Sequence, residues 1–143
     1  SLVGSEMCIR DRLKPGKPTF FGQQRDGRGF VFGLPGNPAS AYTVFDLLVR
    51  PHLQVLSGGA APVDLDVAVG GAPFRANRRL QAVPARLRAA AGSTTAELLK
   101  MGPSGDPFGL LPADGFALIP AEAGPDAVNA VPFVPYGRAW PGR

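Results

Sequence analysis

The stretch Phe30–Ser40, with the sequence FVFGLPGNPAS, contains the sharpest change of local pattern in the chain. Its first three residues are aromatic or β-branched and predict a short strand. Asn37 is a favoured helix N-cap, and Pro38 suits the first helical position, where a backbone N–H has no partner. Gly33 and Gly36 permit backbone conformations or close approaches that other residues resist. The stretch therefore predicts a strand that turns directly into a helix.

The segments on both sides of this stretch continue the two patterns. Upstream, residues 20–24 and 29–34 flank an Asp26-Gly27 turn and predict a hairpin or two short strands. Downstream, apolar residues recur at helical spacing from about Ala39 to Leu56, and Pro51 is expected to bend or split the second half of this helix. The predicted apolar face consists of Ala41, Val44, Phe45, Leu48, Leu53, Val55 and Leu56.

The small residues of Ser57–Pro62 end in a proline and predict a domain boundary. Beyond it, the alternation of apolar and other residues from Val63 to Val69 indicates a half-buried strand. Further short extended segments follow at 80–90, 94–101, 116–120 and 128–136, a spacing typical of a small β-barrel or sandwich. We therefore expect an α/β portion over residues 13–60 and a small all-β, barrel-like domain over residues 61–143.

The first twelve residues, SLVGSEMCIRDR, show neither strand nor helix periodicity. They lack the basic start and apolar stretch of a secretory signal. Because they resemble translated adapter sequence, residues 1–12 are set aside as an artefactual leader, and Cys8 with them. Residues 13–60 offer too few strands and helices for an independent α/β core. We therefore expect a fragment whose upstream domains are missing.

The amino-acid composition favours some kinds of binding site and argues against others. The 143 residues carry 15 Lys and Arg against 11 Asp and Glu, and the resulting charge of +4 favours a local site for a small anion. The arginines between residues 75 and 88 lack interleaved aromatic rings, which argues against a nucleic-acid surface. One cysteine and one histidine leave little basis for a Cys-based zinc site or a Ser-His-Asp triad, and His52 is expected to pack. No apolar run approaches the ~20 residues of a membrane span.

Two features predict an oxyanion site. The turn before Ser40 offers free backbone amides and the positive end of a helix dipole. Just upstream, the KPGKP segment holds Lys14 and Lys17 between prolines, which lowers the cost of ordering them around an anion. Each feature also has an interpretation without a ligand. The GLPGNPAS segment can be only a strand-to-helix turn, and the two lysines can be only solvated loop charges.

Together these motifs resemble a known family. KPGKP, a short strand pair, GLPGNPxS and a helix ending in Leu-Leu-Val-Arg-Pro-His-Leu are similar to the molybdopterin molybdenumtransferases, the MoeA and gephyrin E-domain family. A looser similarity covers residues 63–138, including the segments ADGFALIP and VPF. The resemblance implies that residues 13–60 close a MogA-like, molybdopterin-binding α/β domain and that the rest is the C-terminal β-domain. It also implies insertion of molybdate into adenylylated molybdopterin, with Mg²⁺.

The resemblance places substrate- and oxyanion-binding residues at Lys14, Lys17, Pro35, Gly36, Asn37, Pro38, Ser40 and Ser104. One position departs from the family, because the expected β-domain arginine falls on Pro84, so Arg79 or Arg86 would have to replace it. The ligands of Mg²⁺ are expected upstream of this chain, and no metal ligand or general base is assigned within it.

The expected function is therefore a transferase step of molybdenum cofactor biosynthesis, in which this fragment binds and orients the oxyanion and is inactive alone. The alternatives are a non-catalytic scaffold or interaction module, or a generic phosphate-ligand binder of the same fold. The expected partner is a small-molecule substrate, and neither nucleic acid nor a membrane is expected to bind. We expect the full-length parent to be a homodimer located in the cytoplasm.

Overall fold

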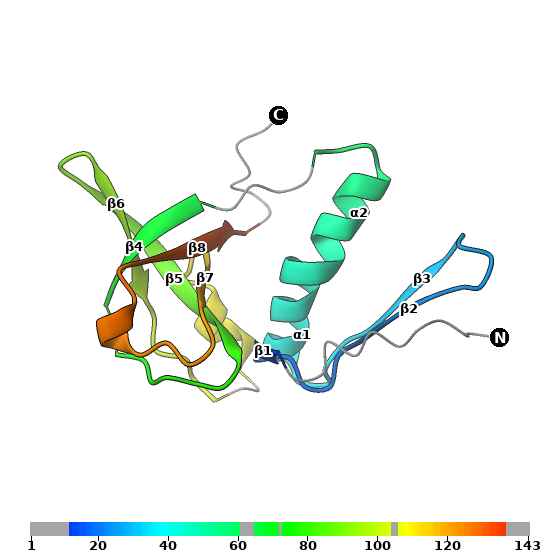
Figure 1. The fold of residues 1–143 in the computed structure, drawn as a ribbon, viewed down its shortest axis with the longest axis horizontal. Helices are drawn as coiled ribbons and strands as arrows, with labels where there is room; N and C mark the ends of the chain where they lie inside the picture. The colour runs from blue at the N-terminus through cyan, green and yellow to red at the C-terminus, as the bar shows by residue number, and fades with distance from the viewer. Residues whose placement is uncertain (1–11, 61–64, 72, 104–105, 137–143) are drawn as a thin grey trace.

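The computed structural model describes residues 12–60, 65–71, 73–103 and 106–136. Figure 1 shows a barrel-like sheet, a long helix and a projecting hairpin, with the helix between the other two. The strands are β1 (Leu13–Lys14), β2 (Phe20–Gln23), β3 (Phe30–Gly33), β4 (Leu65–Gly71), β5 (Leu80–Ala90), β6 (Ser93–Leu98), β7 (Gly115–Ile119) and β8 (Ala130–Pro135). The helical segments are α1 (Pro38–Val44), η1 (Phe45–Val49), α2 (Arg50–Leu56), η2 (Pro107–Leu110) and η3 (Pro125–Ala127).

The hairpin expected upstream of the helix is confirmed. Strands β2 and β3 pair antiparallel, with Phe21 opposite Phe32. Gly27 has a φ of +72° in the turn, a conformation that favours glycine, and the Arg28 N–H donates to Asp26 Oδ1 at 3.0 Å.

The helix is split, as expected, but by a change of hydrogen bonding and not by a break. Segment η1, over Phe45–Val49, is π-helical and joins α1 to α2 without interruption. Pro51 is the second residue of α2 and has no N–H to donate to the preceding turn. The π-helical segment lies directly before the turn that contains this proline, so the change of hydrogen bonding coincides with the position at which the α-helical pattern is expected to be disturbed.

The predicted apolar face of the helix is only partly correct. Val44 is fully buried, but Leu53, Val55 and Leu56 are 47%, 52% and 59% exposed. The barrel lies against the first half of the helix, so the apolar residues of the second half have no such cover among the described residues. On that half His52 packs edge-on against the hairpin, with its ring 4.5 Å from that of Phe30.

The strands after residue 65 form a closed barrel. Their order is β5-β6-β4-β8-β7, and β7 pairs again with β5; only β4 and β6 are parallel. Alternate residues point inward and form a core of Val67, Val83, Ala85, Ala96, Leu98, Ala117, Ile119, Val131 and Phe133. The expected strands lie within a few residues of the observed ones; Val63 falls outside the described residues. Of the two predicted architectures, the structure forms the barrel.

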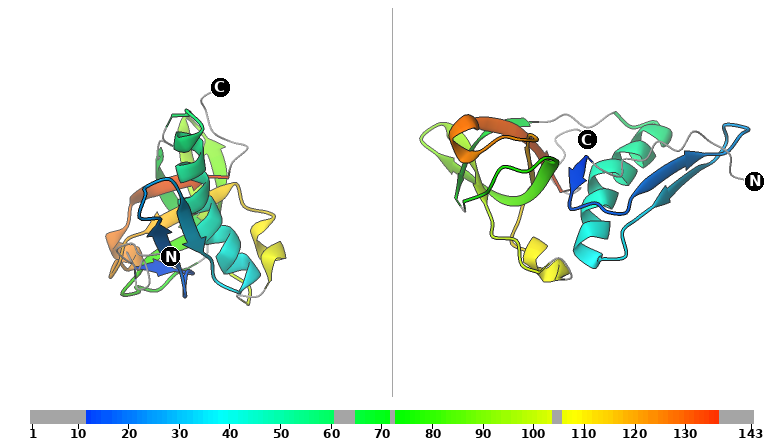
Figure 2. Two further views of the ribbon diagram at one scale, coloured as in Figure 1. Left: turned by 90° about the vertical axis from the view of Figure 1, so that its right-hand side faces the viewer. Right: turned by 60° about the horizontal axis from the view of Figure 1, so that its bottom comes forward.

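A second apolar cluster joins the helix to the barrel. It contains Leu13 of β1, Ala39 and Val44 of α1, and Ala82, Leu110 and Phe116 from the barrel side. Strand β1 pairs parallel with the start of β5, with Lys14 opposite Gln81. Residue 12 continues this pairing, because the Leu80 N–H donates to the Arg12 carbonyl at 2.9 Å. The short β1 strand is therefore an edge of the barrel sheet and lies beside the first turns of the helix (Figure 2).

The assignment of residues 13–60 to an α/β domain stays a prediction, since these residues form the hairpin, the helix and the β1 edge strand. None of the described helices has the length and apolar character needed to cross a bilayer.

The joining cluster yields a stability prediction. Phe116 is 1% exposed and contacts the helix side of the cluster, whereas Phe108 is 73% exposed. Phe116→Ala should lower the free energy of unfolding by about 3–5 kcal/mol, because apolar burial is removed and a cavity remains. Phe108→Ala should change it by less than about 0.5 kcal/mol. Urea denaturation followed by circular dichroism measures both; equal effects would contradict the described packing.

Candidate oxyanion site

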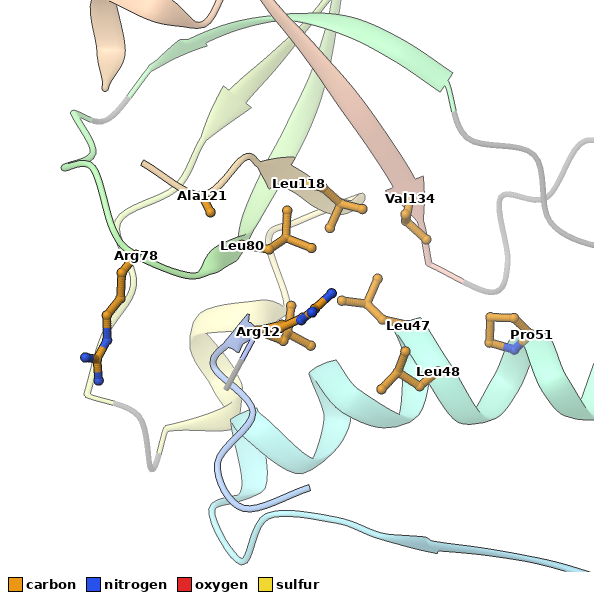
Figure 3. A pocket seen from close by; sticks show the side chains of 10 residues that line it. Arg12, Leu47, Leu48, Pro51, Arg78, Leu80, Leu118, Ala121 and Val134 are labelled. Carbon is orange, nitrogen blue, oxygen red and sulfur yellow. The ribbon is translucent and has the colours of Figure 1, made fainter. Parts of the chain in front are cut away.

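The two predicted anion-binding motifs lie at the same corner of the molecule. Leu13 and Ala39 belong to one apolar cluster, Lys14 directly follows the first, and Ser40 directly follows the second. Figure 3 shows the segment after β1 running beside the first turns of α1. The start of the KPGKP segment and the helix start after the GLPGNPAS turn therefore lie at one apolar cluster, although they are far apart in the sequence.

The KPGKP segment folds back tightly on itself. The Lys14–Pro15 and Lys17–Pro18 peptide bonds are both cis. Gly16 is buried, and a Cβ at its position would lie 3.2 Å from the Leu13 carbonyl oxygen. The Thr19 hydroxyl donates to the Gly16 carbonyl and closes the turn. Both lysines are exposed on this compact segment.

The GLPGNPAS turn has one open side. Pro35 is buried and Ser40 is 6% exposed, so neither side chain is freely presented to solvent. Gly36 is exposed, and a Cβ built on it would meet nothing within 4 Å. Gly33 differs, because a Cβ there would collide with the ring of Phe20. A ligand can therefore approach the backbone of this turn at Gly36.

Asn37 occupies the predicted N-cap position but does not cap the helix with its side chain. The first helical bond runs from the Ala41 N–H to the Asn37 carbonyl at 2.8 Å, which confirms the start of the helix. The Asn37 side-chain oxygen is buried and accepts no hydrogen bond from the residues described. The capping bond expected from the sequence is therefore absent.

The structure separates the two arginines expected to replace the family arginine at Pro84. Pro84 is fully buried and pairs with Phe116. Arg79 Nη1 donates to the Leu13 carbonyl at 3.5 Å, directly before Lys14 in the chain. Arg86 Nε donates to the Pro112 carbonyl at 3.0 Å, away from that strand. Arg79 is thus the guanidinium next to the KPGKP segment. Ser104, the remaining predicted site residue, lies outside the described residues.

Sequence reasoning missed a polar group on the helix. Asp46 is 3% exposed, and its Oδ1 accepts from Arg50 Nε at 2.7 Å. Arg50 Nη2 also donates to the Pro135 carbonyl at 3.3 Å, so this buried ion pair ties the helix to the end of β8. The acidic residue four positions before an arginine was the available signal, although the same spacing is common on exposed helices.

Tyr136 lies next to this ion pair and packs on two aromatic rings. Its ring centroid is 5.1 Å from that of Phe116 and 5.6 Å from that of Tyr42. Its hydroxyl donates to the Leu110 carbonyl at 3.5 Å, a long contact. Burial is the main cause that raises the pKa of Tyr136 well above its usual value, and the nearby Tyr42 and Asp46 add to the effect.

The corner offers charge and hydrogen-bond donors. Two lysines, one arginine and an accessible backbone turn can hold an oxyanion by electrostatic attraction and directed N–H groups. Among the residues described, no group of three or more His, Cys, Asp or Glu side chains is placed to hold a metal ion. The donor set present here does not fit magnesium, so we derive no step through that ion in this chain.

Comparisons with known proteins identify similar sequences. No protein-family model matches the chain. It is 43% identical over 51 residues to the molybdenum cofactor synthesis protein cinnamon of Drosophila melanogaster, covering 36% of this chain and 8% of that protein. It is 41% identical over 56 residues to the molybdopterin molybdenumtransferase of Haemophilus influenzae, covering 39% of this chain and 13% of that protein.

Solved structures extend the similarity to the fold. A molybdopterin biosynthesis moeA protein from Pyrococcus horikoshii superposes with a TM-score of 0.67 at 21% identity, over 94% of this chain and 33% of that chain. A molybdenum cofactor biosynthesis protein from Pyrococcus furiosus gives a TM-score of 0.66 at 21% identity, over 93% of this chain and 46% of that one. The chain thus spans less than half the length of these relatives. The resemblance to the C-terminal part of a molybdopterin molybdenumtransferase is confirmed.

The absence of a capping bond at Asn37 can be tested by comparing its substitution with that of Asp106, whose side chain does make a capping bond. The Asp106 carboxylate accepts from the Phe108 N–H at 2.9 Å at the start of η2. Asp106→Ala should cost about 1 kcal/mol of stability, the usual loss for a bonded cap. Asn37→Ala should cost less than about 0.5 kcal/mol because it removes no capping bond. Chemical denaturation of both variants measures the difference, and the reverse order of the two losses would contradict this geometry.

Tyr136 yields a pH prediction. Its pKa is raised in the folded state, while an unfolded tyrosine ionises at about 10. Its contribution to stability is therefore complete below about pH 10 and is lost as the pH rises through the folded-state pKa. The stability of the chain should fall between about pH 9 and about pH 11, and Tyr136→Phe should reduce that fall. Urea denaturation at the two pH values checks this; an unchanged pH dependence in the variant would remove Tyr136 as its source.

Proposed function

We propose that this chain supplies the oxyanion-binding corner of a protein that inserts molybdate into adenylylated molybdopterin, a step of molybdenum cofactor biosynthesis. The observation that carries the proposal is the meeting of the KPGKP segment and the GLPGNPAS turn at one place in the fold. The named activities of the relatives from Haemophilus influenzae and Drosophila melanogaster support the choice of substrate.

In this proposal the corner acts by electrostatics and position. Molybdate is a small dianion, and the ammonium groups of Lys14 and Lys17 offset its charge. The exposed backbone at Gly36 gives directed contact from the helix start, where the dipole favours negative charge. Holding the oxyanion and the phosphate of the pterin in fixed orientation lowers the entropic part of the barrier. No general base is assigned within this corner.

The remaining predicted residues take supporting roles. The rigid rings of Pro35 and Pro38 hold the turn, and Asn37 presents an amide whose oxygen makes no capping bond. Arg79 adds a guanidinium beside β1 in place of the family arginine that Pro84 replaces. The hydroxyls of Ser40 and Ser104 complete the oxyanion-binding set that we propose.

The wider organisation belongs to the same proposal. Residues 13–60 complete a MogA-like, molybdopterin-binding α/β domain, and residues 61–143 form the C-terminal β-domain. The full-length protein is a cytoplasmic homodimer that uses magnesium held by residues outside this chain. Because the chain spans only part of its relatives, we propose that it cannot perform molybdenum insertion alone.

The lysine pair gives the direct test. Replacing both Lys14 and Lys17 with alanine should weaken molybdate binding by about 1–3 kcal/mol for each charge-assisted hydrogen bond that the change removes. The melting temperature should remain nearly the same, since both side chains are exposed. Isothermal titration calorimetry of the chain with sodium molybdate measures the affinity. Lys100→Ala, at an exposed lysine after β6, is the matched control and should bind as the unaltered chain does.

An activity assay tests whether the chain alone is inactive. A mixture of the chain, adenylylated molybdopterin, molybdate and magnesium should show no molybdate-dependent release of AMP, and such release would contradict the proposed inactivity. In the calorimetry described above, unchanged molybdate affinity in the double lysine variant would assign the lysines to ordinary surface charge.

A separate titration with AMP tests the alternative of a generic phosphate-ligand binder. Binding of AMP that molybdate does not affect would favour that alternative.

A further inference from the structure

The chain contains two Asp-Gly pairs, Asp26-Gly27 and Asp114-Gly115, and the structure places them in contrasting surroundings. In an Asp-Gly pair the glycine nitrogen is poorly shielded, because glycine has no Cβ, and its backbone adopts conformations that other residues resist. This nitrogen can therefore attack the carboxyl carbon of the preceding aspartate. Whether it does so in a folded protein depends on how firmly the surrounding structure holds both groups.

The first pair lies at the tip of the hairpin. Residues 23–28 are all exposed, and the tip points away from the helix and the barrel in Figure 1. Among the described strands, β2 and β3 pair only with each other. A two-stranded hairpin is marginally stable by itself, so its tip opens at a low free-energy cost. A Cβ built on Gly27 would meet only Gln23 Nε2, at 3.7 Å, so this position is not packed against the rest of the chain.

The Asp26 carboxyl group is held beside the peptide with which it would react. Its Oδ1 accepts a hydrogen bond from the Arg28 N–H at 3.0 Å. This bond closes a ring that spans Gly27, so it keeps the carboxyl group on the side of the Gly27 nitrogen. The Gly27 N–H donates to the Gln24 carbonyl at 2.9 Å, and that bond has to open before the nitrogen reacts. At an exposed hairpin tip this opening is local and does not require unfolding.

The second pair is fixed by the barrel. Gly115 is buried in β7 and is paired with Ala85 of β5 and with Pro135 of β8. The Asp114 carboxylate accepts from the Leu87 N–H of β5 at 2.8 Å, so a different strand holds it. Opening this pair disrupts the sheet on both sides of β7, which costs far more free energy than opening the hairpin tip.

We propose that Asp26 is a site of spontaneous conversion to isoaspartate, and that the barrel protects Asp114 from the same reaction. The Gly27 nitrogen gives up its proton and bonds to Cγ of the protonated Asp26 carboxyl group. One carboxyl oxygen leaves as water with that proton and the carboxyl proton, and a cyclic succinimide remains. Water then adds to one of the two succinimide carbonyl carbons. Addition at Cγ restores aspartate, whereas addition at the backbone carbonyl gives isoaspartate.

The product changes the hairpin turn. In isoaspartate the chain runs through the side-chain carbons, so the backbone of the turn is longer and carries a free α-carboxylate. The hydrogen bond from the Arg28 N–H to Asp26 Oδ1 is lost in its present form. The modified turn is thus a substrate for an enzyme that methylates isoaspartyl carboxyl groups. The modification does not involve molybdate, so it is independent of the function proposed above.

The test incubates the full chain at neutral pH and body temperature and maps its peptides by mass spectrometry. Endoproteinase Asp-N cleaves before aspartate and not before isoaspartate, so resistance to cleavage measures the conversion at each position. Isoaspartate should accumulate at residue 26 about ten-fold faster or more than at residue 114, because the two pairs differ in the free energy of local opening. Methylation of the aged chain by a purified isoaspartyl methyltransferase, with S-adenosylmethionine, should rise in parallel.

Two controls identify the cause. In guanidinium chloride the two Asp-Gly pairs should react at similar rates, since the structure that separates them is gone. Asp26→Glu keeps the charge but cannot form the five-membered ring, so this variant should lose the methylation while its circular dichroism stays unchanged. Absence of isoaspartate at residue 26 in the folded chain would overturn the proposal. Equal rates at residues 26 and 114 in the folded chain would overturn it too, as would a ten-fold difference that persists in denaturant.

Discussion

The joint between the helix and the barrel depends on the burial of a few apolar side chains contributed by three separate elements. Leu13 of β1, Val44 of α1 and Phe116 of β7 meet there, and each is at most 7% exposed. Strand β1 is two residues long and cannot be held by its backbone hydrogen bonds alone. The burial of Leu13 therefore fixes the point from which the KPGKP segment leaves the sheet, and the burial of Ala39 fixes the start of the helix.

Elements set by local pattern could be predicted from the sequence. The Asp26-Gly27 turn, the helix start at Pro38 and the β5 strand over residues 80–90 each depend on neighbouring residues. The buried face of the helix could not be predicted, because periodicity does not reveal how far along the helix its partner extends. The sequence assigns Leu53 and Leu56 to one broad apolar face together with Val44, yet both leucines are exposed in the structure because the barrel ends before it reaches them.

In the candidate site, too, the sequence predicts the local features but not how they come together. Its two motifs are visible in the sequence because glycine, proline and lysine have local consequences for the backbone and for charge. Their proximity depends on the pairing of β1 with β5, and two residues carry too little pattern to predict that pairing. The position of Arg79 beside Leu13 results from the same pairing. Asn37 shows the limit of a local rule, since a favoured cap residue stands at the cap position without making the bond.

The π-helical turn over Phe45–Val49 also sets the rotational phase of the helix. A π-helical turn holds about one residue more than the 3.6 residues of an α-helical turn, so the residues after it are rotated by about 100° relative to an uninterrupted helix. The two halves can therefore present different sides to different neighbours. The first half places Ala39 and Val44 against the barrel, and the second half places His52 against the hairpin rings. The continuous helix therefore packs against both the barrel and the hairpin, which lie on opposite sides of it in Figure 1.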